Sequence, residues 1–289
     1  MEKTKAICHG AATIINAIAM GKGAAFGVDL WTKAEVKLTD EPNIIEGKIV
    51  SDSNENPILI QKTVERVFKH FGLDKKFGAK VKTWSNIPIA RGLKSSSVAA
   101  NAIALATVAA LKKNLDDLTI VKLGVDGAVA SKVTITGAFD DASAAYFGGV
   151  VITDNPRRRI VKHFRAPEDL TVLFHIPRKK AYTINSDVHK METVASLVKI
   201  AYKEALKGNY WAALTLNGLI YSSALGYDSS VALSALTAGA LAAGLSGKGP
   251  AVTAVVQGEK VDSVKNAWQA HEGDILQARV NHEKAKVVS

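Results

Sequence analysis

Residues 88–97 read Pro88-Ile89-Ala90-Arg91-Gly92-Leu93-Lys94-Ser95-Ser96-Ser97, and the alanine-rich stretch 98–111 follows them. Pro88 disfavours continuation of the preceding element, and Gly92 permits backbone conformations that a side chain would block. Serine oxygens at 95–97 are typical of helix N-caps, and the stretch after them is a good helix former. The pattern therefore predicts a tight loop that leads directly into a helix.

A loop of this kind directs several backbone N–H groups toward one point, at the positive end of a helix dipole. We expect an anion to bind there, with Lys94 as a mobile positive charge. The hydroxyls of Ser95 and Ser96 are candidate ligands for Mg²⁺. The alternative is an ordinary capped helix with no ligand, and the rest of the chain bears on that choice.

The loop resembles the phosphate-binding motif of the GHMP kinase superfamily (galacto-, homoserine, mevalonate and phosphomevalonate kinases), whose pattern is Pro-x-x-x-Gly-Leu-Gly-Ser-Ser-Ala-Ala. The sequence matches that motif at Pro88, Gly92, Leu93, Ser95, Ser96, Ala99 and Ala100. It departs at Lys94, where the superfamily usually has glycine, so this lysine must either avoid a positive φ or tolerate one. The Gly-Leu-Lys-Ser-Ser-Ser form is similar to the archaeal type of shikimate kinase within the superfamily. The resemblance implies that residues 88–97 hold the phosphates of ATP.

Two adjacent acids, Asp140 and Asp141, lie in an otherwise apolar stretch that ends at Gly148-Gly149. Buried carboxylates are costly without partners, although the start of a helix also favours acids. The stretch resembles the superfamily segment Asp-Asn-Ala that ends in Gly-Gly. Counted back from the two glycines, the resemblance implies that Asp141 is the catalytic aspartate, with Asp140 as the second candidate. Such a carboxylate orients or deprotonates a hydroxyl, or binds Mg²⁺.

The glycine-rich stretch 244–251 is predicted to connect a helix to a strand, and a plain hairpin-type connection is the alternative. It resembles the third superfamily motif through Ser246, Gly247 and Gly249. In those enzymes this loop lies against the phosphate loop and the acceptor substrate. The resemblance therefore implies that these three residues contact the substrate.

The segment 10–17, with the glycines of 21–27 after it, resembles the first superfamily motif in its homoserine-kinase-like form. We expect Asn16, within that segment, to contact the substrate. Ala11 stands where mevalonate kinases place a catalytic lysine, so this position supplies no lysine to assist the base. Lys22 is an alternative source, although a surface lysine in a glycine-rich turn explains it equally. The chain contains no Walker A motif.

Hydrophobic residues make up 47% of the 289-residue chain and charged residues 22%, which argues for a packed protein and against disorder. A single cysteine, Cys8, excludes an internal disulfide and suits a reducing compartment. The apolar stretch 6–20 mimics a signal peptide, but His9 and Asn16 interrupt it and no convincing cleavage site follows. We therefore expect a soluble, cytoplasmic protein with no membrane partner.

The formal net charge of +10 permits a basic surface without a partner, attraction of small anionic substrates, or nucleic-acid binding. The basic residues are scattered along the chain, and the dense clusters 157–159 and 178–180 have no interleaved aromatic residues. We therefore expect no nucleic-acid partner. An arginine should bind the carboxylate of shikimate, and Arg178 at the end of a predicted strand is the first candidate. Arg91 and the cluster 157–159 are alternatives.

Strands and helices are mixed without strict β-α-β alternation, which favours an α+β fold. Strands are expected at 3–8, 27–38, 78–84, 149–153, 160–164, 170–176, 251–257 and 275–280. Helices are expected at 58–71, 97–112, 116–131, 140–147, 191–207, 210–225, 231–243 and 261–271. The turn at Asn155-Pro156 is the best boundary. It agrees with the two-domain GHMP kinase fold, an S5 domain 2-like half with the phosphate loop at 1–155 and a ferredoxin-like half at 156–289.

The resemblance implies an ATP- and Mg²⁺-dependent kinase that phosphorylates a hydroxyl of shikimate to give shikimate 3-phosphate, a step of aromatic amino acid biosynthesis. Homoserine kinase, or another GHMP small-molecule kinase, is the alternative within this class. An alternative from another class is a non-catalytic RNA-binding module that shares the S5-like half. The oligomeric state does not follow from the sequence.

Overall fold

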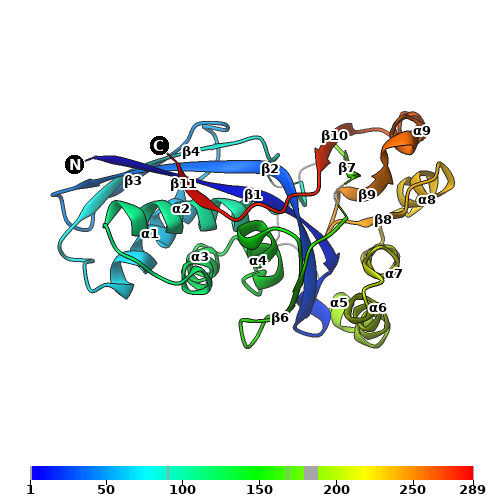
Figure 1. Cartoon of the computed structure of the whole chain (residues 1–289), viewed down its shortest axis with the longest axis horizontal. Helices are drawn as coiled ribbons and strands as arrows, with labels where there is room; N and C mark the ends of the chain where they lie inside the picture. Colours follow the sequence, from blue (N-terminus) through cyan, green and yellow to red (C-terminus); the bar gives the residue numbers. More distant parts are fainter. Residues whose placement is uncertain (1, 90, 168, 179–187, 289) are drawn as a thin grey trace.

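The computed structural model describes residues 2–89, 91–167, 169–178 and 188–288, which build two antiparallel-dominated sheets with helices against them (Figure 1). The mixed α+β class expected from the sequence is confirmed. The first sheet has a central path of five strands, with two more at the side of its long second strand. The path runs β11(Lys286–Val288), β1(Lys3–Ile15), β2(Lys22–Thr39), β4(Gly78–Ser85) and β3(Ile45–Ile49), and β2 also pairs with β5(Val150–Asp154), which pairs with β6(Arg159–Phe164).

Alternation decides which face of the first sheet is buried. Ala6, Cys8, Ala34, Val36 and Val81 are 0–2% exposed, whereas the exposed residues that alternate with this set in β1, β2 and β4 are lysines, at positions 3, 5, 33, 37, 80 and 82. Three helices pack against the apolar face: α1(Ile58–His70), α2(Ser95–Ala110) and α4(Phe139–Phe147). The helix α3(Asp117–Ala130) packs on these three helices. Ala100, Ala102, Ala104 and Ala106 of α2 are buried, and their small side chains let this helix lie close to the strands beneath it.

The second sheet has the strand order β10(Asp274–Arg279), β7(Leu170–Ile176), β9(Val252–Gln257) and β8(Ala242–Leu245). Its β7 has a partner on each side, as expected for a central strand. The helices of this half are α5(Val188–Glu192), α6(Ala195–Lys207), α7(Tyr210–Leu225), α8(Ser230–Thr237) and α9(Val261–Trp268). A short 3-10 helix, η1(Ala17–Ala19), follows β1.

The structure corrects several predicted elements. The helix expected at 231–243 is wrong beyond Thr237, because Gly239 adopts φ +100° and residues 242–245 pair with β9 instead. The helix expected at 191–207 is divided into α5 and α6. The first strand continues to Ile15 rather than ending at Cys8. The short strands β3 and β11 were not expected, because five and three residues give too short a pattern to predict a strand.

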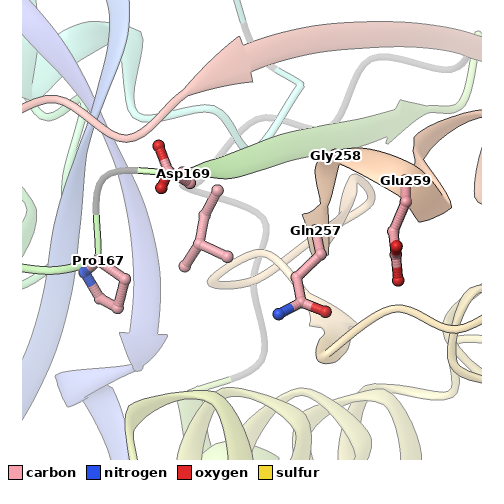
Figure 2. A pocket seen from close by; sticks show the side chains of 6 residues that line it. Pro167, Asp169, Gln257, Gly258 and Glu259 are labelled. Atoms are coloured by element: carbon pink, nitrogen blue, oxygen red, sulfur yellow. The ribbon is translucent and has the colours of Figure 1, made fainter.

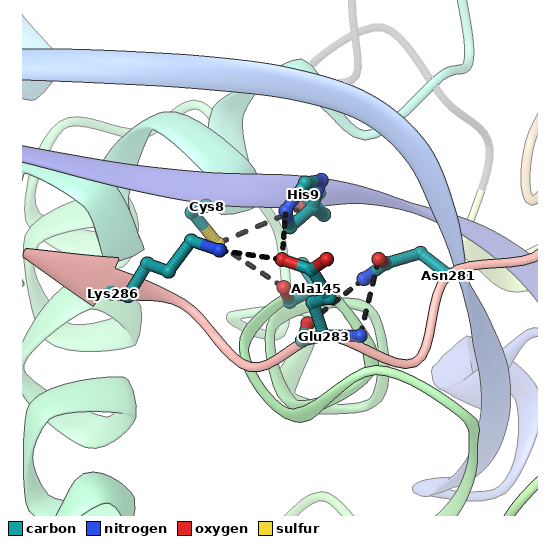
Figure 3. Close-up of polar contacts among 6 residues, drawn as sticks. All are labelled: Cys8, His9, Ala145, Asn281, Glu283 and Lys286. Carbon is teal, nitrogen blue, oxygen red and sulfur yellow. Dashed lines mark hydrogen bonds and ion pairs between the residues drawn. The ribbon is translucent and has the colours of Figure 1, made fainter. Parts of the chain in front are cut away.

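The end of the chain returns to the first sheet, where β11 pairs with β1 (Figures 1 and 3). Asn281 fixes the approach through two hydrogen bonds with the backbone of Glu283, at 2.9 and 3.1 Å. Cys8 is buried under this segment, and its thiol donates to the carbonyl of Ala145 at 3.2 Å. Both β6 and β11 lie beyond residue 155, and the division into 1–155 and 156–289 stays a prediction.

Candidate active site

The phosphate loop leads into α2 as the sequence predicted, but Lys94 rather than a serine is the N-cap residue. Lys94 has φ +63° and ψ +20°, so it adopts the left-handed conformation that favours glycine. The expected serine N-caps are wrong, because Ser95–Ser97 lie inside the first turn. The first N–H groups of a helix have no acceptor within the helix, so those of Ser95 and Ser96 are available to an anion. Ala90 lies outside the described residues.

The left-handed turn at Lys94 brings its ammonium group to Asp141, with Nζ 3.2 Å from Oδ2. The other carboxylate oxygen of Asp141 accepts a hydrogen bond from the hydroxyl of Thr13 in β1, also at 3.2 Å. Asp141 is only 3% exposed and lies in the first turn of α4, whose helix dipole favours a negative charge. Three elements distant in the sequence therefore hold this carboxylate in place.

Asp140 has a different environment, although it is the neighbour of Asp141. Its Oδ1 accepts from the side-chain amide of Asn155 at 2.9 Å, and Asn155 in turn accepts from the hydroxyl of Thr153 at 2.7 Å. Burial, followed by the nearby charge of Asp141, raises the pKa of Asp140 to about 7. Its carboxylate packs on Gly23, where any Cβ would overlap it. Asp140 thus has an amide partner, and Asp141 has the cation.

The glycine-rich loop of residues 246–250 joins β8 to β9, so the hairpin-type connection is correct, and the loop also lies on the phosphate loop. The hydroxyl of Ser246 donates to the carbonyl of Gly92 at 2.9 Å. A Cβ on Gly92 would lie 2.8 Å from the carbonyl of Gly249. A Cβ on Gly247 would overlap Nζ of Lys94, so this glycine gives the lysine its room. Phosphate loop, third motif and Asp141 form one cluster.

Two residues of this cluster were missed in the sequence. Thr13 is one of several apolar or small residues in a strand, and nothing in its surroundings marks it as a partner of Asp141. The position of Lys248 between two glycines of the third motif could have indicated a lysine of the site. Burial, with the neighbouring charge of Lys94, lowers the pKa of Lys248 to about 7.

The chain has close relatives among known proteins. A relative named Shikimate kinase from Methanosarcina mazei is 44% identical over 97% of this chain and 95% of its own length. Another of that name from Methanosarcina acetivorans is 45% identical over the same shares. Residues 59–149 match the family described as GHMP kinases N terminal domain. The chain belongs to the archaeal shikimate kinases of the GHMP superfamily. Among solved structures, a homoserine kinase from Cytophaga hutchinsonii has the same fold, with a TM-score of 0.75 at 16% identity over 100% of this chain and 98% of that one.

In this chain the lysine beside Asp141 is Lys94, which comes from the phosphate loop. Ala11, where mevalonate kinases place a lysine, is a buried residue of β1. Lys22 does not replace it, because its Nζ lies 5.9 Å from the ring centre of Tyr202. Lys94 thus provides a charge next to Asp141 from a position where most of the superfamily has glycine.

The remaining predicted residues have varied surroundings. Asn16 is buried, and its side chain caps η1 by accepting from the N–H of Ile18 at 3.0 Å. Arg178 follows β7 with its side chain 77% exposed and 3.4 Å from Glu272. Arg91 donates to the carbonyl of Pro177 at 2.5 Å, which ties the phosphate loop to the end of β7. Both arginines therefore lie in the region where this strand meets the loop.

Across the described ranges, no three His, Cys, Asp or Glu side chains gather so as to hold a metal ion. No helix in the same ranges is both long and apolar enough to cross a membrane. A shallow pocket lined by Pro167, Asp169, Leu170 and residues 257–259 lies at the far end of the second sheet (Figure 2), since Leu170 pairs with Gln257 whereas the loop 246–250 adjoins the other end. The pocket is therefore separate from the cluster around Asp141.

Proposed function

We propose that this chain transfers the terminal phosphoryl group of ATP to a hydroxyl of shikimate, giving shikimate 3-phosphate. The relatives named Shikimate kinase support this activity over nearly the whole chain. The observation that supports the residue roles is the contact between Lys94 and Asp141 at the start of α2. One side chain there reaches both an anion-binding helix end and a buried carboxylate.

Residues 88–97 bind the triphosphate in this proposal. The N–H groups of Ser95 and Ser96 point outward from the helix start, and Lys94 and Lys248 add positive charge from two loops that touch. Within the described residues, the hydroxyls of Ser95 and Ser96 form no hydrogen bond, so both are available as Mg²⁺ ligands beside the phosphates. The ion, when bound, neutralises charge on the transferred group.

Asp141 acts on the acceptor hydroxyl. Thr13 and Lys94 fix the carboxylate from both sides, so it can orient the attacking oxygen and take up its proton late in the transfer. Phosphoryl transfer is largely dissociative, and positioning with charge stabilisation provides most of the acceleration. The ammonium group of Lys94 then stabilises the negative charge of the phosphates during the transfer, as the bond to the leaving oxygen of ADP breaks.

The acceptor lies beside Asp141, where the phosphate loop and the loop 246–250 meet. Ser246, Gly247 and Gly249 lie at this junction, and Arg178 or Arg91 binds the carboxylate of shikimate because guanidinium matches carboxylate geometry. Asn16 supports the acceptor site indirectly, by capping the short helix η1 that follows β1. The exposed ion pair of Arg178 with Glu272 is weak enough to exchange for a substrate carboxylate.

A coupled ATPase assay with a panel of acceptors tests the proposal. ADP release should require shikimate, Mg²⁺ and ATP, and mass spectrometry should find one added phosphoryl group on shikimate. Homoserine and mevalonate should give only the background rate of the Asp141→Asn variant. Turnover of homoserine without turnover of shikimate would contradict the acceptor and leave the kinase chemistry intact.

A further inference from the structure

The solvent face of the first sheet carries a regular array of lysines. Cross-strand partners share a face, so the pairing registers place these side chains in rows. One row is Lys3, Lys37, Lys80 and Glu46, and the next is Lys5, Glu35, Lys82 and Lys48. The helices α1–α4 lie on the opposite face (Figure 1), and the described lysines of this face are exposed.

The array places like charges directly opposite each other, which destabilises a sheet. Lys37 has Lys3 on one side and Lys80 on the other. Glu35 lies 3.0 Å from Lys3 and 4.0 Å from Lys5, and Glu46 lies 3.2 Å from Lys80. Within the described chain, Lys37, Lys48 and Lys82 have no acidic side chain within 4.0 Å. Folding alone does not favour this arrangement, whereas an anionic partner would relieve its repulsion.

Two tryptophans extend the array at one end. Lys33 forms the third row with Trp84 directly opposite it, and its Nζ lies 4.8 Å from the ring centre of Trp31. Both rings are partly exposed on the same face as the lysines. An inorganic anion or an acidic peptide would pair with the lysines but would gain no binding from flat aromatic rings. Unstacked bases would gain binding from them, because every base can stack on an aromatic side chain.

We propose that this lysine face, defined by Lys3, Lys5, Lys33, Lys37, Lys48, Lys80 and Lys82 with Trp31 and Trp84, binds single-stranded nucleic acid. Neighbouring strands are ~4.8 Å apart and alternate residues ~6.7 Å apart, so the lysines follow an extended phosphate backbone across the sheet. The bases stack on the two tryptophans. The lysine rows lie on the face of the sheet opposite to α1–α4, so they are separate from the kinase cluster, whereas Trp84 lies at the end of β4 that leads toward the phosphate loop. This inference opposes the sequence expectation of no nucleic-acid partner, which was drawn from spacing along the chain alone.

Fluorescence anisotropy with a labelled 20-nucleotide oligouridylate tests the proposal on the full-length protein. The variant Lys37→Gln/Lys80→Gln/Lys82→Gln removes three charges from the centre of the face. Since each phosphate contact contributes about 0.7 to the slope of log K against log salt for single strands, the slope should fall by roughly 2. Trp84→Leu should weaken binding by about 10-fold through lost stacking. The matched control, Lys69→Gln/Lys199→Gln/Lys203→Gln, changes exposed lysines elsewhere and should bind like the parent.

Both lysine variants should retain shikimate kinase activity, and all three variants should keep a cooperative thermal transition above the assay temperature, so a loss of binding does not reflect unfolding. Equal weakening by the control set would show unspecific attraction to a basic protein and overturn the proposal. Absence of binding to the oligonucleotide at low salt would also overturn it. Binding to phosphatidylserine vesicles in place of the oligonucleotide would assign the face to a membrane surface instead.

Discussion

At the residue scale, the two neighbouring aspartates make different contacts, and the difference predicts different phenotypes. Asp141→Asn keeps the shape and removes the charge that Lys94 and Thr13 hold. Its kcat should fall by roughly 10²-fold or more, the usual effect of losing a positioned base. KM values should change much less, because ground-state binding survives.

Asp140→Asn is the control and should be milder in a steady-state assay, since Asn155 can still donate to the new amide oxygen. An inactive Asp140→Asn enzyme beside an active Asp141→Asn enzyme would show that the register taken from Gly148-Gly149 is wrong by one residue. Full activity of both variants would refute the carboxylate mechanism.

Lys94 combines an unfavourable backbone conformation with a charge beside Asp141. Lys94→Gly removes no backbone stability, because glycine adopts φ +63° without steric cost, but the buried Asp141 loses its cation, so the melting temperature should fall. The substitution should also lower kcat by roughly 10²-fold, the effect expected when one preorganised charge contact is removed. The matched control is Lys132→Gly, since Lys132 also has a positive φ of 59° and is remote from the cluster. A similar loss of kcat in both variants would assign the effect to the backbone.

Lys248 should make ATP use pH-dependent. Its pKa of about 7 in the free protein means that the side chain is neutral above that pH, and a triphosphate binds better to the protonated form. The kcat/KM for ATP should therefore decline above pH 7, by up to about 10-fold per pH unit for one required proton. Lys248→Arg, which stays charged, should move this decline to higher pH. The Asp140→Asn variant should show the same decline above pH 7 as the parent. If Asp140→Asn abolishes the decline and Lys248→Arg does not move it, the titrating group is Asp140.

At the element scale, the phosphate loop and the β8–β9 loop form one unit, so a substitution in either should disturb the other. Gly92→Val introduces a side chain at φ +84° and against the carbonyl of Gly249. It should raise the KM for ATP or abolish activity while the protein remains folded by circular dichroism. Gly226→Val is the matched control, because Gly226 has φ +73° and nothing within 4 Å of a Cβ. An active Gly92→Val enzyme with unchanged ATP affinity would remove the phosphate assignment.

At the scale of the whole molecule, the first sheet needs strands from both ends of the chain. A fragment of residues 1–155 lacks β6 and β11, which leaves edges of β5 and β1 unpaired. We expect the fragment to aggregate or to lack a cooperative thermal transition, in contrast to the full chain. Cooperative unfolding of the soluble fragment would instead show that 1–155 folds independently.

The sequence by itself determined the local elements and the identity of the motifs. Some features act only through their neighbours in the chain, so their structural consequences could be predicted. These are the alternation in residues 27–38, the glycine at 92 and the small residues after Ser97. Asp141 and Ser246 were predicted as site residues because they match motifs of the superfamily. The helix expected at 231–243 failed because residues 242–245 gain more from pairing with β9 than from continuing a helix past Gly239.

Only the tertiary structure decided which charges meet. Lys94 reaches Asp141 because a left-handed turn, a glycine at 247 and the start of α4 converge, and no spacing in the chain encodes that convergence. The lysines of the first sheet are separated in the sequence by buried residues and by whole elements, so they look scattered. Pairing of β1, β2, β4 and β3 in register gathers them on one face, because side chains that alternate along each strand align across strands.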